Sequence, residues 1–265
     1  MFKALLAVQW KWTKGAALLA FIIAFAIPLA SVQSIGTREY YGRAAILYQQ
    51  LGADSSLAAT LNFLACIRRD EGDCPGALQL FAEAREFCVR HDHRGTLSAV
   101  LTNMGATLLR QGDLQAAETT LEEAIALCRE RGSQQLLGVA MGNLALVAFR
   151  QERYGEASEY NTSALRIYAA VQALVNLPDA LAMAAILESR YGEPDRAARL
   201  LSAADGLFQA LDVPRPSDLI SDLDAATDRT RRTLGEEIFA VRFAEGAEMD
   251  VDEAIACALE PHRSQ

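Results

Sequence analysis

Histidine and cysteine are scarce in this sequence of 265 residues, which contains three histidines and five cysteines. No pair of cysteines has the CxxC spacing of a zinc site or a thiol redox motif. Cys88 and Cys128 share a helical phase and lie one repeat apart. Stacked repeats are separated by roughly 10 Å, which exceeds the Cα separation of about 7 Å that a disulfide tolerates. The sequence therefore predicts free cysteines and excludes a fold held together by disulfides.

Motifs of enzymatic chemistry are also lacking. The sequence has no GxxxxGK[ST], GxGxxG, GxSxG or HExxH motif. His91 and His93 flank Asp92 in a predicted turn, but a metal site there would need further ligands. We therefore predict a non-catalytic protein that has no metal and no cofactor.

Positive charge is in deficit, with 25 Lys and Arg against 34 Asp and Glu, a formal net charge of −9. A negative protein repels the phosphates of nucleic acid. Strand signals are weak too, because Val, Ile and Thr do not alternate with polar residues, whereas Ala, Leu, Glu, Gln and Arg favour helix. The composition predicts an all-α fold and no nucleic-acid partner.

One long hydrophobic run is present. The 23 residues between Lys14 and Arg38 carry no charge, and a helix of that length spans the roughly 30 Å of a bilayer core. Lys3, Lys11 and Lys14 precede the run, which favours a cytoplasmic N-terminus. We expect residues 1–36 to be a transmembrane anchor that contacts the membrane through residues 15–35, in a single-pass protein whose remaining part faces away from the cytoplasm. A cleaved signal peptide is the alternative.

A repeat of 40 residues follows this run. The dipeptides Gly72-Asp73, Gly112-Asp113, Glu152-Arg153 and Gly192-Glu193 recur at this spacing. Two alanine columns keep the same register: Ala77, Ala117, Ala157 and Ala197, and then Ala84, Ala124, Ala164 and Ala204.

These columns predict two helices per unit. A glycine ends the first helix because it adopts the left-handed conformation at little cost, and the aspartate after Gly72 or Gly112 can cap the second helix. Alanine recurs where two helices cross closely. Each pair buries its apolar face by stacking on its neighbours.

The segments "NMGATLLRQGDLQAAETTLEEAIALC" and "GNLALVAFRQERYGEASEYNTSALRIY" resemble tetratricopeptide (TPR) repeats. The 40-residue period is similar to the longer-helix variety of kinesin light chains and maltose-activator-type regulators. The resemblance implies a right-handed α-solenoid over residues 37–212. Residues 213–265 are expected to form a C-terminal helical cap of three helices, and this end resembles that of large bacterial regulators of the LuxR and MalT type.

The resemblance also implies a binding surface, because the first helices of such repeats line the concave face. Asn103 and Asn143 occupy equal phases there, and an asparagine at this place often bonds the backbone of an extended peptide in the family. Arg110, Arg150 and Arg190 share another phase and could pair with an acidic partner. The alternative is that these side chains are solvated and that the arginines interact favourably with the helix C-termini.

We therefore expect a membrane-anchored scaffold or adaptor that binds a protein or peptide through the concave face. Two alternatives remain open at this point. One is the regulatory or sensory remnant of a bacterial transcriptional regulator, and the other is an accessory subunit of a membrane transporter.

Overall fold

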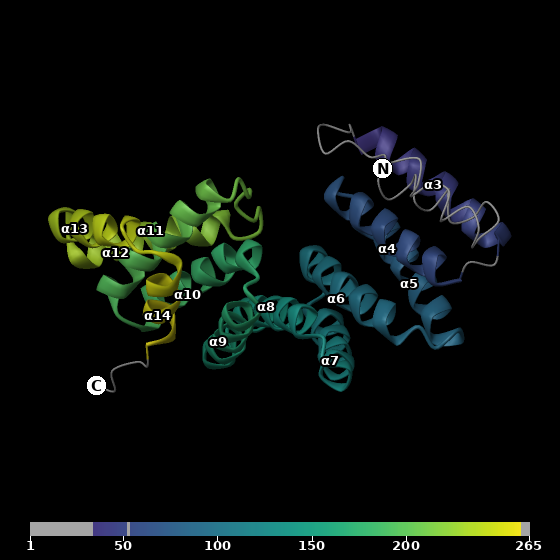
Figure 1. Cartoon of the computed structure of the whole chain (residues 1–265). Coiled ribbons are helices and arrows are strands. Elements are labelled where there is room, and N and C mark those ends of the chain that lie inside the picture. Colours follow the sequence, from purple (N-terminus) through teal and green to yellow (C-terminus); the bar gives the residue numbers. More distant parts are fainter. Residues whose placement is uncertain (1–33, 52–53, 261–265) are drawn as a thin grey trace, which may run out of the picture. The chain divides into compact units, whose positions relative to one another are not determined.

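The computed structural model describes residues 34–51 and 54–260, and within them the chain is all-α, with twelve α-helices, one short 3-10 helix and no strand (Figure 1). The helices are α3 (Ser34–Leu51), α4 (Asp54–Asp70), α5 (Cys74–Arg90), α6 (Arg94–Gln111), α7 (Leu114–Arg131), α8 (Gln134–Arg150), α9 (Tyr154–Val171), α10 (Leu177–Tyr191), α11 (Pro194–Ala210), α12 (Ile220–Leu234), α13 (Glu236–Ala247) and α14 (Val251–Leu259), with η1 at Leu174–Asn176. The predicted all-α class and the predicted three helices after the repeats are confirmed for this part of the chain.

The helices divide into two compact units, and the division falls between Thr96 and Leu97, near the start of α6. In the first unit α4 packs against both α3 and α5. In the second unit α7 packs on α8, α8 on α9, and α10 on α9 and α11. The domain boundaries at 36/37 and 212/213 stay predictions.

The membrane prediction needs correction. Among the described helices none has both the length and the hydrophobicity to cross a bilayer. Residues 1–33 lie outside the described residues, and α3, which overlaps the end of the apolar run, carries Arg38, Glu39 and Arg43. The predicted single-pass localisation, with its cytoplasmic N-terminus and outward-facing repeats, is therefore wrong. The membrane anchor has no part in the function proposed below.

The alanine columns lie where helices meet. Each of the eight predicted packing alanines is at most 1% exposed: Ala77, Ala84, Ala117, Ala124, Ala157, Ala164, Ala197 and Ala204. They lie on the second helices, which begin at Cys74, Leu114, Tyr154 and Pro194. Small side chains at these points let neighbouring helices approach closely.

The glycines that end the first helices do not all behave alike. Gly72 and Gly112 adopt the left-handed conformation, each with φ +88°, as predicted. Gly192 does not, since its φ is −117°. A Cβ at Gly192 would lie 1.8 Å from Oε2 of Glu188, so this position requires glycine because a buried carboxylate passes close to the backbone.

Replacement of Glu152 by glycine is expected to stabilise the protein. Glu152 stands where Gly72 and Gly112 stand and holds φ at +62°, a conformation that costs a residue with a Cβ about 1–2 kcal/mol. Glycine removes this strain but gains freedom in the unfolded chain, so the net gain is about 0.5–1 kcal/mol in the free energy of unfolding. Urea denaturation measures it. Glu152→Ala keeps the strain, and equal stability of the two variants would contradict the explanation.

Helix α10 is the centre of the second unit. It packs against α9, α11, α12 and α14, and every residue from Leu177 to Glu188 except Asp179 is buried. A helix that is apolar on all sides is stable only when it is surrounded. Helices α9, α11, α12 and α14 therefore surround α10, and Leu187 and Tyr191 of α10 line the groove described below.

Candidate functional site

The two asparagines predicted to bind a peptide lie on the first helices of successive pairs. Asn103 on α6 and Asn143 on α8 are both partly exposed. The backbone carbonyl of Asn103 accepts a hydrogen bond of 2.8 Å from the Thr107 hydroxyl within α6. Peptide binding by this pair stays a prediction.

The three arginines that share a phase have different surroundings. Arg110 is exposed at the end of α6. Arg150 donates to the Asp222 carboxylate at 2.6 Å and to the backbone carbonyl of Asp218 at 2.5 Å, which fixes the start of α12 against the end of α8. Sequence reasoning missed this role because the partners lie 68 and 72 residues further along the chain.

Arg190 belongs to an aromatic cluster. Its guanidinium lies 5.6 Å from the ring centroid of Tyr154 and 5.8 Å from that of Phe149. The Tyr154 ring lies 4.5 Å from the ring of Tyr191, between centroids, and 5.7 Å from Phe149 in an edge-on arrangement. A cation over an aromatic face contributes about 0.5–1 kcal/mol at an exposed site. Of the three predicted arginines, Arg110 is thus exposed, Arg150 forms an ion pair and Arg190 belongs to an aromatic cluster.

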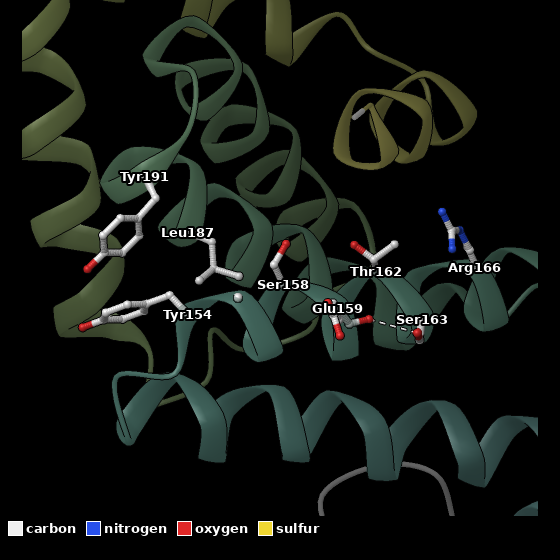
Figure 2. Close-up of a pocket in the computed structure, with 9 residues that line it drawn as sticks. Tyr154, Ser158, Glu159, Thr162, Ser163, Arg166, Leu187 and Tyr191 are labelled. Carbon is white, nitrogen blue, oxygen red and sulfur yellow. Dashed lines mark hydrogen bonds between the residues drawn. The ribbon is translucent and has the colours of Figure 1, made fainter. Parts of the chain in front are cut away.

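A groove of about 860 Å³ begins at this cluster and follows helix α9 (Figure 2). Tyr154 and Tyr191 lie together at one end, Arg166 lies at the other, and Leu187 of α10 forms one side. The remaining lining residues are Gly155, Ser158, Glu159, Thr162 and Ser163. The sequence did not reveal this groove, although these residues recur at helical spacing on one face of α9.

Asn161, also on α9, is a polar residue in the core. It is 3% exposed and occupies the column in which Phe81, Leu121 and Leu201 are apolar. Its amide donates a hydrogen bond of 2.9 Å to the carbonyl oxygen of Ala180. Because a buried amide is tolerated when it is hydrogen-bonded, Asn161 joins α9 to the first turns of α10.

A buried ion pair joins Glu188 of α10 to Arg196 of α11. Arg196 lies 2.5 Å from Oε1 of Glu188, and their side chains are 4% and 8% exposed. Oε2 of Glu188 accepts the Glu193 backbone N–H at 3.0 Å, and Arg196 also donates to the carbonyl of Glu260 at 2.7 Å. The pair therefore ties together α10, α11 and the end of α14.

Side chains suited to metal binding do not gather in the described residues. That part of the chain contains no cluster of three or more His, Cys, Asp and Glu side chains able to hold a metal ion. The His91 ring stacks on Phe87 at 4.4 Å. All five cysteines are free, and burial raises the pKa of the Cys66, Cys88, Cys128 and Cys257 thiols.

Asp179, at the start of α10, is expected to make stability depend on pH. Asp179 is exposed at the surface, but the protein around its carboxyl group desolvates it, and this desolvation and secondarily the Asp218 carboxylate raise its pKa to about 6. An acid whose pKa is higher in the folded state favours folding when protonated, so stability rises as the pH falls through 6. We expect Asp179→Asn to raise Tm at pH 7.5 and to reduce the rise in Tm between pH 7.5 and 5, as measured by circular dichroism. An equal rise in both proteins would refute this assignment.

Comparisons with known proteins agree with this architecture. Residues 96–170 match the family described as "Tetratricopeptide repeat". Over 239 residues, 90% of this chain, the sequence is 28% identical to proteins of Mycobacterium bovis and Mycobacterium tuberculosis named as HTH-type transcriptional regulators. The chain spans 24% of the length of these relatives.

Two solved structures show the same fold. BtubC (BKLC) from P. vanneervenii aligns with a TM-score of 0.60 at 20% identity, over 89% of this chain and 97% of that chain. A STAND protein (signal transduction ATPase with numerous domains) with a tetratricopeptide repeat sensor, from Pyrococcus horikoshii, aligns with a TM-score of 0.52 at 16% identity, over 86% of this chain and 39% of that chain. The chain is thus an all-α array of helix pairs similar to tetratricopeptide repeats.

Proposed function

We propose that this chain is a non-catalytic protein-interaction module that binds a peptide segment of a partner through the first helices of its repeats. The observation that carries this proposal is the match of residues 96–170 to tetratricopeptide repeats, together with Asn103 and Asn143, which are equivalent and partly exposed within that stretch. Amide side chains at regular spacing can bond the backbone of an extended peptide, and neighbouring side chains then select its sequence.

The experiment compares the wild type with an Asn103→Ala/Asn143→Ala variant. Proteins bound to each are quantified by affinity purification from the native cells, and Tm is measured to check folding. Gln135→Ala, an exposed change on α8, is the control. We expect the asparagine variant alone to lose its main partner by about tenfold, a loss of about 1.4 kcal/mol. Retention of the same partners would refute binding at this surface.

A second function is favoured by the 28% identity to regulators over almost the whole chain. Under this proposal the chain corresponds to a regulatory segment of such proteins, with a repeat of the longer, 40-residue variety and a C-terminal end of the LuxR and MalT type. It would respond to a small molecule, so a ligand that raises Tm in the absence of any protein partner would favour it. The transporter alternative depended on the membrane segment and is not pursued.

A further inference from the structure

The groove along α9 (Figure 2) has the length and floor of a docking site for a helix. From Tyr154 to Arg166 the α9 backbone rises about 18 Å, or about three helical turns. Gly155, Ser158 and Thr162 form the floor at helical spacing, and a Cβ added at Gly155 would meet no atom within 4 Å. Small side chains in such a row let a second helix approach closely.

Two charges of opposite sign stand along this floor. Glu159 and Arg166 both line the groove and are both exposed. Neither has an ion-pair partner in the ranges 34–51 and 54–260. Seven residues of helix place them about 10 Å apart, which matches two charges that lie two turns apart on a partner helix.

The aromatic end offers an anchor for an apolar side chain. Tyr191 is 61% exposed, whereas Tyr154 beside it is partly covered. The Tyr154 ring already has Arg190 over one face, so the cluster is held in place before a ligand arrives. Interfaces draw much of their binding energy from such fixed aromatic residues.

A helix already lies next to this groove. A smaller hollow of about 180 Å³ shares Ser158, Thr162, Arg166 and Leu187 with it and is closed by Ala258, Leu259 and Glu260 at the end of α14. Helix α14 packs on α9, α10 and α11, and Arg196 holds the Glu260 carbonyl. The surface that receives α14 is therefore continuous with the open groove.

We propose that the α9 groove binds an amphipathic helix of a partner protein. The partner helix presents a cation to Glu159 and a carboxylate to Arg166, two turns apart, and an apolar side chain to Tyr154 and Tyr191. This inference rests on the proposed interaction role but concerns a surface separate from Asn103 and Asn143.

Two designed peptides of 15 residues test the proposal. Both are helical, with one face of Ala that carries a Leu only near its N-terminal end and with a Lys and a Glu seven positions apart, and they differ only in the order of these two charges. Their binding to the full chain is measured by fluorescence anisotropy. Because the Leu is expected to pack on Tyr154 and Tyr191 at one end of the groove, only the order in which Lys precedes Glu sets Lys against Glu159 and Glu against Arg166. We therefore expect that order to bind about tenfold more tightly than the other, and Ser158→Trp, which fills the groove, to abolish binding.

Reversal of the two groove charges tests whether Glu159 and Arg166 select the partner helix. Glu159→Lys/Arg166→Glu is expected to reverse the preference between the two peptides, whereas Glu122→Lys/Arg129→Glu, exposed charges with the same spacing on α7, is expected to leave it unchanged. The Asn103→Ala/Asn143→Ala variant should bind the preferred helix as the wild type does, which separates this site from the peptide surface.

Three results would overturn the helix site. The first is binding of neither peptide, equally tight binding of both, or binding that Ser158→Trp does not weaken. The second is equally tight binding of a proline-containing peptide of the same composition, which would indicate an extended partner. The third is self-association in sedimentation that Ser158→Trp abolishes, which would make a second copy of the chain the occupant.

Discussion

Arg196→Met is expected to lower the free energy of unfolding by about 3–5 kcal/mol, because it leaves the Glu188 carboxylate buried without its cation. The Glu188 and Arg196 side chains are 8% and 4% exposed. The variant also loses the hydrogen bond from Arg196 to the Glu260 carbonyl, which holds the end of α14. The effect should therefore extend beyond the pair, and α14 should become accessible to protease earlier than the rest of the second unit.

Urea denaturation followed by circular dichroism gives the free energy, and limited proteolysis followed by mass spectrometry locates the first cut. The matched control is Glu188→Met/Arg196→Met. Because removal of both charges leaves no buried ion, the double variant should recover most of the loss. If the double variant is less stable than Arg196→Met, the buried charge is not the cause.

Gly246→Ala is expected to destabilise the protein by about 1–3 kcal/mol, the range for overpacking in a filled core. Gly246 on α13 faces the backbone of α11, and an added Cβ would lie 2.1 Å from the carbonyl oxygen of Arg199. Backbone atoms cannot turn aside as a flexible side chain can, so α13 must move away from α11. Movement of α13 also displaces Phe239, which lines a hollow together with residues of α11 and α12.

Gly206→Ala on α11 is the control, since a Cβ there meets nothing within 4 Å. Glycine within a helix costs about 0.5–1 kcal/mol relative to alanine, so this variant should gain stability while Gly246→Ala loses it. Thermal and urea denaturation of both variants show whether each substitution raises or lowers the stability. A gain at both positions would contradict the close approach of α13 to α11.

The sequence was sufficient to predict much of the fold, because its strongest signals are local. Glycine columns mark the ends of first helices, and alanine columns mark close crossings, so the all-α class and the buried alanines could be read from spacing alone. The long apolar run between Lys14 and Arg38 is also a local signal, and it led to the incorrect prediction of a single-pass membrane protein. Hydrophobicity over one window does not by itself establish a membrane span.

The candidate site was predicted less well. Asn103 and Asn143 could be named from their equal phase, and their role stays a proposal. The groove along α9 could not be predicted, because its sides come from α9 and α10 and its neighbour α14 lies about a hundred residues further on. Residues such as Ser158 and Thr162 look like any exposed helix face until the surrounding helices are in place.

The sequence by itself determined the helices and their pairing, since periodicity, caps and small residues act within a few turns. Only the tertiary structure decided which polar residues are structural. Arg150 forms an ion pair with Asp222 of α12, and Arg196 contacts both Glu188 and the end of α14. Gly192 is glycine because a side chain there would meet the Glu188 carboxylate, and not because its backbone is left-handed. The physical reason is that the role of a charge depends on burial and on partners distant in sequence, neither of which is expressed in local spacing.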